Sequence, residues 1–274
     1  MNLNEKVALV TGSSRGVGKA VALGFAKKGA NVVINYTSNQ NAADSVVSEI
    51  EAMGQSAVAI KADVAQKAEV ENLVNTAADK FGKVDILVNN AGFTRPAMMV
   101  KMQEAQWDQV VDIHLKGAFL CSQAAGKLMK QQNSGKIINV TSVAGIVGTV
   151  GQINYSAAKG GIISMTKSIA REMARYNVCA NVISLGIVAT DMTEKIRTDE
   201  KLKEIFFAWR KEKALNEGVP LYRIITNSAV DEVIKNLPEQ VGKLHMIKGI
   251  GPATQENYGS EIIAIIKNYK EGII

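Results

Sequence analysis

The chain has 274 residues, of which 47% are hydrophobic and 21% charged, and its formal net charge is +6 at pH 7. This composition argues against a mainly disordered chain, and the length suits one large α/β domain or a medium domain joined to a small one. Two cysteines exclude a disulfide framework, and two histidines leave no material for a His/Cys metal cluster.

The start of the chain shows no secretory signal, and no apolar run approaches the ~18 residues of a membrane span. We therefore expect a cytoplasmic location without membrane association. Cys121 and Cys179 lie in apolar surroundings, which predicts two buried structural thiols.

Six short apolar runs, rich in β-branched residues, alternate with helix-length amphipathic stretches up to about residue 186. The runs are KVALVTG (6–12), ANVVINY (30–36), SAVAIKADV (56–64), VDILVNNAG (84–92), GKIINVTS (135–142) and VCANVISLG (178–186). Strands that are apolar on both faces and alternate with helices predict a doubly wound parallel sheet, Rossmann-like, covered on both sides.

The stretch TGSSRGVGKA (11–20) follows the first predicted strand and opens a helix. Glycines at 12, 16 and 18 allow a tight turn and let a pyrophosphate approach the positive end of the helix. A glycine-rich turn without a ligand is the alternative interpretation.

The second predicted strand points to NADP(H) over NAD(H). An NAD site usually has a carboxylate about 20 residues beyond the glycines, yet no Asp or Glu occurs between Gly12 and Ala43. Arg15 lies inside the glycine loop and Lys19 just beyond it, so a 2′-phosphate would meet positive charge. A solvated loop charge is the alternative interpretation of Arg15.

Tyr155 and Lys159 are four residues apart on a predicted helix, so they share a face. A nearby ammonium lowers the pKa of a phenol, and the phenol can then donate a proton to a carbonyl oxygen. Ser142 ends the fifth predicted strand, where its hydroxyl could hold the same oxygen.

Together these motifs resemble the short-chain dehydrogenase/reductase family, closest to its 3-oxoacyl-acyl-carrier-protein reductase type, over residues 1 to about 194. NNAG (89–92), YSAAK (155–159) and VATDM (188–192) carry the resemblance beside the glycine loop. It implies a catalytic set of Ser142, Tyr155, Lys159 and His114. It also implies these cofactor contacts: Gly12, Ser14, Arg15, Gly16, Val17, Gly18, Asn35, Asp63, Val64, Asn89, Ala91, Gly92, Tyr155, Lys159, Ile187, Val188 and Thr190.

Two departures from the family pattern concern the site. His114 in DIHLKG takes the place of an Asn that is thought to hold a water in the proton relay to the lysine; a neutral imidazole can also bond water, and a core histidine without a catalytic role is an equal alternative. Leu185 replaces the usual proline after the sixth strand.

The family pattern fades at about Glu194, so its substrate-covering helix and seventh strand are absent. The rest resembles the HRDC domain, a small helical module, mainly in LNEGVPLYRIITNSAVDEVIKNLP and LHMIKGIGPATQENYGSEIIAII. We expect two domains, residues 1–196 and 199–274, the second with a helix near 199–217, two short helices at 228–237 and 238–247, and a last helix at 260–269.

Three functions stay open: an NADP-dependent carbonyl reductase of the 3-oxoacyl thioester type, a catalytically poor dinucleotide-binding protein, and a nucleic-acid-binding protein using the tail. The nearly balanced charge of the tail allows only weak nucleic-acid contact. We expect a homodimer through the long helices at 103–131 and 152–176, with the tail near the edge of the sixth strand.

Overall fold

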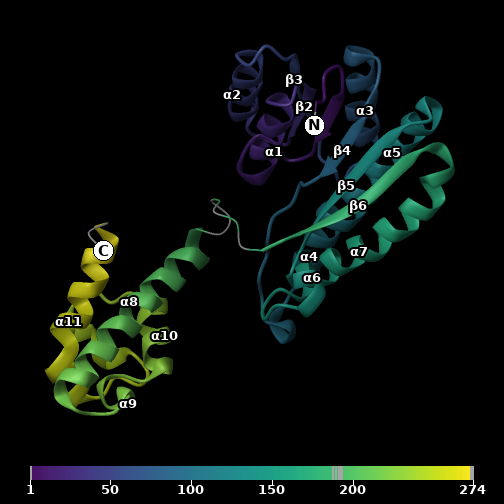
Figure 1. Cartoon of the computed structure of the whole chain (residues 1–274). Coiled ribbons are helices and arrows are strands. Elements are labelled where there is room, and N and C mark those ends of the chain that lie inside the picture. The colour runs from purple at the N-terminus through teal and green to yellow at the C-terminus, as the bar shows by residue number, and fades with distance from the viewer. Residues whose placement is uncertain (1, 187, 189, 191–193, 272–274) are drawn as a thin grey trace. The chain divides into compact units, whose positions relative to one another are not determined.

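In the computed structural model, residues 2–186, 188, 190 and 194–271 are described, without the side chains of 194–199 and 270. The chain divides into two compact units, Met1–Met192 and Thr193–Ile274 (Figure 1). Each unit is described by itself.

The first unit is built on a six-stranded parallel sheet with the order β3-β2-β1-β4-β5-β6 (Figure 1). The strands are β1 (Val7–Val10), β2 (Asn31–Tyr36), β3 (Ala57–Lys61), β4 (Ile86–Asn89), β5 (Gly135–Ser142) and β6 (Val178–Leu185). All six lie inside the predicted apolar runs. The order reverses direction between β1 and β4, and such a switch point forms a crevice at the carboxyl ends of the strands.

Helices cover the two faces of the sheet unequally. Helices α1 (Gly16–Ala26) and α2 (Gln40–Glu51) pack on the face formed by alternate residues of β1 and β2, such as Val10 and Ile34. Helices α3 (Lys67–Phe81), α5 (Gly117–Gln132) and α7 (Ile153–Met173) pack on the opposite face. The predicted doubly wound fold is confirmed.

The predicted long helix at 103–131 is a continuous run of three parts. It consists of α4 (Glu104–Val111), a single π-helical turn η2 (Asp112–Lys116) and α5. π-Helical turns inside α-helices are often found at functional sites, and this one carries His114. Shorter elements complete the unit: η1 (Met99–Lys101), α6 (Ala144–Val147) and η3 (Ala174–Tyr176).

Strand β6 lies at the edge of the sheet and pairs with β5 over its whole length, from Val178 opposite Gly135 to Leu185 opposite Ser142. Its alternate residues Cys179 and Ile183 are exposed, the latter by 47%. The expectation of two buried thiols was therefore wrong for Cys179, because no helix of the described first unit covers that face of β6. Cys121 is buried as expected.

The second unit is helical throughout its described residues, as predicted. It contains α8 (Glu194–Glu217), α9 (Leu221–Ile224), α10 (Asn227–Asn236), the 3-10 helix η5 (Val241–Met246) and α11 (Pro252–Lys270). Its core gathers fully buried apolar side chains from all of the longer helices: Phe206, Val230, Val233, Leu244, Ile262 and Ile266.

The last helix starts earlier than the sequence suggested. We predicted a start at residue 260, but α11 begins at Pro252, with Gly251 as its N-cap. Proline suits the first position of a helix because its missing N–H would have no acceptor there. Within the part of the chain that the structure describes, no helix has the length and apolarity needed to cross a membrane.

Candidate active site

The glycine loop joins β1 to α1 and is closely packed. Gly12 and Gly16 have positive φ angles of 61° and 56°, which favour glycine. A Cβ atom on Gly12 would lie 2.8 Å from the Cα of Ala91, and one on Gly18 would lie 2.4 Å from the Gly12 carbonyl oxygen. The absence of side chains therefore lets the loop rest directly on the segment after β4.

Two buried polar side chains hold this loop from behind. Asn35, at the end of β2, accepts a hydrogen bond from the Gly12 N–H at 3.1 Å and donates to the Ala62 carbonyl at 2.9 Å. The Thr11 hydroxyl accepts from the N–H groups of Asn90 and Ala91, each at 3.0 Å. The Asn35 side chain is therefore already hydrogen-bonded to the backbone. It would support a cofactor site indirectly, by fixing the position of Gly12.

The N-terminus of α1 faces solvent without a side-chain cap and without an acidic residue in its first turn. Arg15, at the N-cap, is exposed and has no carboxylate within 4.0 Å among the described residues. Lys19, by contrast, pairs with Glu49 of α2 at 2.8 Å. Of the two cations predicted to meet a phosphate here, only Arg15 is available.

Tyr155 and Lys159 lie in the first turns of α7, beside the end of β5. The Lys159 Nζ lies 5.6 Å from the centroid of the Tyr155 ring and donates to the Val140 carbonyl at 2.7 Å. Burial raises the pKa of Tyr155 above its usual value, and a hydrogen bond with the Ser142 side chain opposes this rise. We expected Lys159 to lower the pKa of Tyr155, but the net shift is upward, with burial as its largest cause and the Ser142 side chain as the group that opposes it.

Lys159 is itself buried, with 4% of its surface exposed. Removal from water disfavours the ammonium and lowers the pKa of Lys159 to about 8. The tyrosine is therefore a neutral proton donor at neutral pH, and the lysine is a cation close to its titration point.

His114 stacks edge-on against Tyr155, with ring centroids 5.1 Å apart and an angle of 89° between planes. Its Nε2 lies 2.7 Å from the Phe93 carbonyl oxygen and 3.1 Å from the Phe93 amide nitrogen, so it donates to the first or accepts from the second according to its tautomer. Burial, and secondly the charge of Lys159, lower its pKa to about 3, so the imidazole is neutral. A Cβ on Gly92 would lie 2.0 Å from the ring, so Gly92 is what makes room for the histidine.

A small enclosed cavity of about 10 Å³ lies behind these side chains, lined by His114, Lys159, Asn89 and Cys121 among others. The Nδ1 of His114 and the Oδ1 of Asn89 are both buried without a hydrogen-bond partner. The volume is close to the minimum for one water molecule. Asn89 also donates to Ser122 at 2.9 Å and to Asn139 at 2.7 Å, so its amide is fixed in place.

The remaining predicted contacts lie around this crevice. Asp63 accepts from the Ala65 N–H at 2.9 Å, and Val64 is buried. Thr190 lies next to the glycine loop, where a Cβ on Gly16 would be 3.6 Å from its methyl group. Val188 is 38% exposed. Ile187 lies outside the described residues.

Two residues that support the site were missed from the sequence. Asn154 is fully buried, and its amide donates to the carbonyls of Arg95 at 3.1 Å and Gln106 at 2.9 Å. Gly145 lets α6 approach α7, because a Cβ there would lie 2.6 Å from the Lys159 carbonyl carbon. No local pattern marks either residue, since both act through segments distant in sequence.

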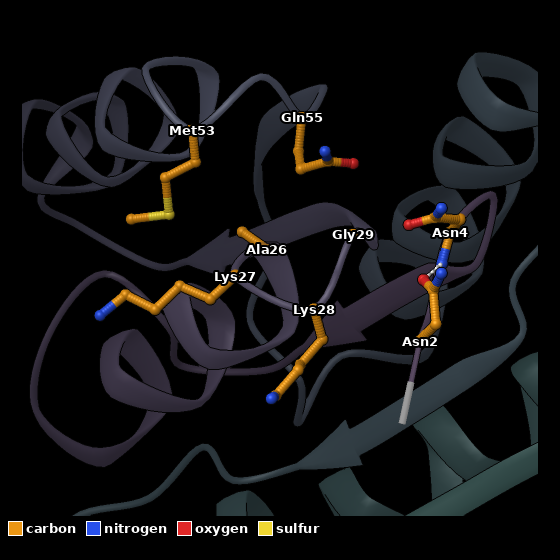
Figure 2. Close-up of a pocket in the computed structure, with 8 residues that line it drawn as sticks. All are labelled: Asn2, Asn4, Ala26, Lys27, Lys28, Gly29, Met53 and Gln55. Atoms are coloured by element: carbon orange, nitrogen blue, oxygen red, sulfur yellow. Dashed lines mark hydrogen bonds between the residues drawn. The ribbon is translucent and has the colours of Figure 1, made fainter.

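A larger hollow of about 510 Å³ lies at the opposite end of the sheet, and its lining includes Lys27 and Lys28 just after α1 together with Asn2, Asn4 and Gln55 (Figure 2). It is open to solvent and lies near the amino ends of β1 and β2. Ligands of such sheets bind at the carboxyl ends, so this hollow is separate from the candidate active site.

Comparisons with known proteins agree with this arrangement. Residues 6–201 match the family model for short chain dehydrogenase, and residues 199–266 match the model for the HRDC domain. A 3-oxoacyl-[acyl-carrier-protein] reductase of Synechocystis is 50% identical over 203 residues, covering 74% of this chain and 82% of the relative. A reductase of the same description from Staphylococcus aureus is 46% identical over 199 residues, covering 73% and 80%.

Solved structures show the same likeness in the first unit. A putative short-chain alcohol dehydrogenase from Sinorhizobium meliloti superposes with a TM-score of 0.70 at 36% identity, covering 74% of this chain and 82% of that one. A short chain dehydrogenase from Mycobacterium avium gives a TM-score of 0.67 at 41% identity, covering 71% of each chain.

Proposed function

We propose that this chain, which belongs to the short-chain dehydrogenase family over residues 6–201, is an NADPH-dependent reductase of 3-oxoacyl thioesters with Tyr155 as its proton donor. The observation that carries the proposal is the placement of Tyr155 beside the buried Lys159, whose Nζ lies 5.6 Å from the Tyr155 ring centroid and donates to the Val140 carbonyl of β5 at 2.7 Å. The names of the relatives supply the substrate class. The direct test is NADPH oxidation with acetoacetyl thioesters; cofactor binding without turnover would instead support a catalytically poor dinucleotide-binding protein.

The residues around the glycine loop fit a dinucleotide. Gly12, Gly16 and the uncapped start of α1 offer backbone N–H groups and close approach to a pyrophosphate, and Thr190 lies beside the same loop. Arg15 would meet a 2′-phosphate. Asp63, Val64 and the NNAG segment would line the adenosine and ribose positions. When bound, NADPH supplies the hydride for the carbonyl carbon.

The chain's own residues would manage the proton. The Ser142 and Tyr155 hydroxyls would hold the carbonyl oxygen, and Tyr155 would give it the proton that completes the alcohol. The ammonium of Lys159 would stabilise the resulting phenolate. These roles are compatible with the positions of the three side chains, since Ser142 ends β5 and Tyr155 and Lys159 lie in the first turns of α7.

We propose that His114 serves this transfer as a neutral positioning group. Its Nδ1 has no protein partner and can bond a water in the cavity behind it, accepting when Nε2 donates to the Phe93 carbonyl and donating when Nε2 accepts from the Phe93 N–H. The same water could bond Asn89 and Lys159, which line the cavity. A relay water would then be held by an imidazole in place of the amide that the family usually has.

The cofactor preference gives a first prediction. Arg15→Ala should weaken NADPH binding about tenfold or more and leave NADH binding nearly unchanged, because a charge-assisted bond to phosphate contributes about 1.5–3 kcal/mol. Fluorescence titration of both cofactors measures this. Lys28→Ala, at the other end of α1, is the matched control. Equal affinities of the unchanged protein for NADPH and NADH would contradict the proposal.

The buried lysine gives a second prediction. Because the pKa of Lys159 is lowered to about 8, its ammonium is present below that pH and is lost above it. The value of kcat/KM for NADPH should therefore fall as pH rises through about 8, with no ascending limb from His114 between pH 5 and 8. Lys167→Met, an exposed lysine on the same helix, should keep this profile. A profile that stays flat to pH 9.5 would show that Lys159 does not control the rate.

The domain boundaries and the assembly stay proposals. The division of the chain between residues 192 and 193 supports two domains near 1–196 and 199–274. Exposed Trp107 on α4 and Phe119 on α5 supply apolar surface for a homodimer through the long helices.

A further inference from the structure

Arg210 of α8 is the one arginine buried among the described residues, with 7% of its surface exposed. Its Nη1 donates to the Ile225 carbonyl at 3.1 Å and to the Asn227 side-chain oxygen at 2.7 Å. Its guanidinium carbon lies 4.7 Å from the centroid of the Phe207 ring. Its Nε is buried without a partner. Every group that contacts this cation is uncharged.

The nearby carboxylates of Asp231 and Glu200 act on Lys203, the other cation at the Phe207 ring. Lys203, which precedes Arg210 by about two turns of α8, also lies over the Phe207 ring, with its Nζ 5.7 Å from the centroid. The carboxylate of Asp231 on α10 pairs with Lys203 at 2.6 Å. No carboxylate of a described residue lies within 4.0 Å of Arg210, so a buried guanidinium remains without a counter-charge, which is energetically costly.

The side chain of Arg210 reaches the first residue of α10, where a second positive feature lies. Thr226 caps this ten-residue helix by accepting from the Ala229 N–H at 3.2 Å. As the first two residues of the helix, Asn227 and Ser228 carry backbone N–H groups without an intrahelical acceptor. The side chains of Thr226, Asn227 and Ser228 are exposed, and the two hydroxyls lie 3.1 Å apart.

We propose that Arg210 and the N-terminal turn of α10 form a binding site for one phosphate group. The oxyanion would accept hydrogen bonds from the free N–H groups of the turn, the Asn227 amide and the hydroxyls of Thr226 and Ser228, and its charge would compensate Arg210 and the helix dipole. Because Asn227 is neutral, it does not compensate the charge of Arg210, and a bound anion can do so. An aspartate at this position would supply the missing carboxylate from within the chain. This site is independent of the reductase function.

The test uses the full chain with Trp107→Phe, so that Trp209 is the single tryptophan and reports on the second unit. Trp209 is next to Arg210 in sequence and packs on Phe206 and Tyr258. Denaturant unfolding is followed by its fluorescence in phosphate and in chloride at equal pH and ionic strength. We expect phosphate to raise the unfolding midpoint and phosphate titration of the native chain to saturate.

Asn227→Asp is the decisive variant, because it changes charge with almost no change in shape. It should raise the midpoint in chloride and weaken phosphate binding about tenfold or more. Asn236→Asp, at the other end of the same helix, is the matched control and should keep the phosphate response. Equal midpoints in phosphate and chloride for the unchanged chain, or equal loss of response in both variants, would overturn the proposal.

A second arm identifies the source of the phosphate. If a short oligothymidylate competes with inorganic phosphate and depends on Asn227 in the same way, the site accepts a phosphodiester. If inorganic phosphate alone binds, the site is one for a free or terminal phosphate. Either result supports the site, and a lack of saturable binding of both ligands excludes it.

Discussion

Tyr155→Phe is expected to reduce kcat with an acetoacetyl thioester at least about 100-fold, which is the usual contribution of a positioned acid. The substitution removes only the hydroxyl, whose pKa the neighbouring Ser142 side chain lowers. The ring stays in place, because it packs edge-on against His114 at 5.1 Å and lies under the Lys159 ammonium. NADPH affinity should therefore change less than about threefold. Steady-state rates and cofactor titration on the same preparation separate the two effects.

Tyr176→Phe makes the same change in η3, just beyond the far end of α7. Tyr176 lies between Lys130 and Arg175, with each cation 4.8 Å from the ring centroid, and contacts none of the proposed catalytic groups. This control should keep full turnover. If Tyr155→Phe keeps most of its activity, the proton comes from another group and the proposed role of Tyr155 is wrong.

The sequence predicted the sheet well because its strands are short, apolar and bounded by turn residues. Ser142 ends β5 and Tyr155 and Lys159 open α7, as their positions in the pattern required. Hydrophobic periodicity did not predict the start of the last helix correctly. It placed the start of the last helix at residue 260, although the proline at 252 is the stronger signal.

The electrostatics of the site could not be predicted from spacing. The spacing of four positions from Tyr155 to Lys159 indicates a shared face, but the depth of burial determines the direction of both pKa shifts, and depth depends on the whole fold. In the same way, the sequence suggested that Lys19 is available to a phosphate, while the fold brings Glu49 of α2 to it. Charge pairs between elements distant in sequence leave no local trace.

Gly18→Ala is expected to weaken NADPH binding at least about tenfold, although the change adds a single methyl group. The new Cβ would lie 2.4 Å from the Gly12 carbonyl oxygen, 2.6 Å from the Asn90 amide nitrogen and 2.9 Å from the Ser13 Cα. Two of these neighbours are backbone, so the glycine loop itself has to move. Overpacking of this kind costs about 1–3 kcal/mol, and about 1.4 kcal/mol corresponds to a factor of ten in affinity.

Gly24→Ala provides the matched control on the same helix. Gly24 is exposed in the last turn of α1, and a Cβ there would meet nothing within 4 Å. Alanine at a helix interior should stabilise the protein by about 0.4–1 kcal/mol and leave cofactor binding unchanged. Thermal unfolding and fluorescence titration of both variants test the pair. If Gly18→Ala binds NADPH as tightly as Gly24→Ala does, close packing of the loop is not what positions the cofactor, and the glycines would matter for backbone freedom alone.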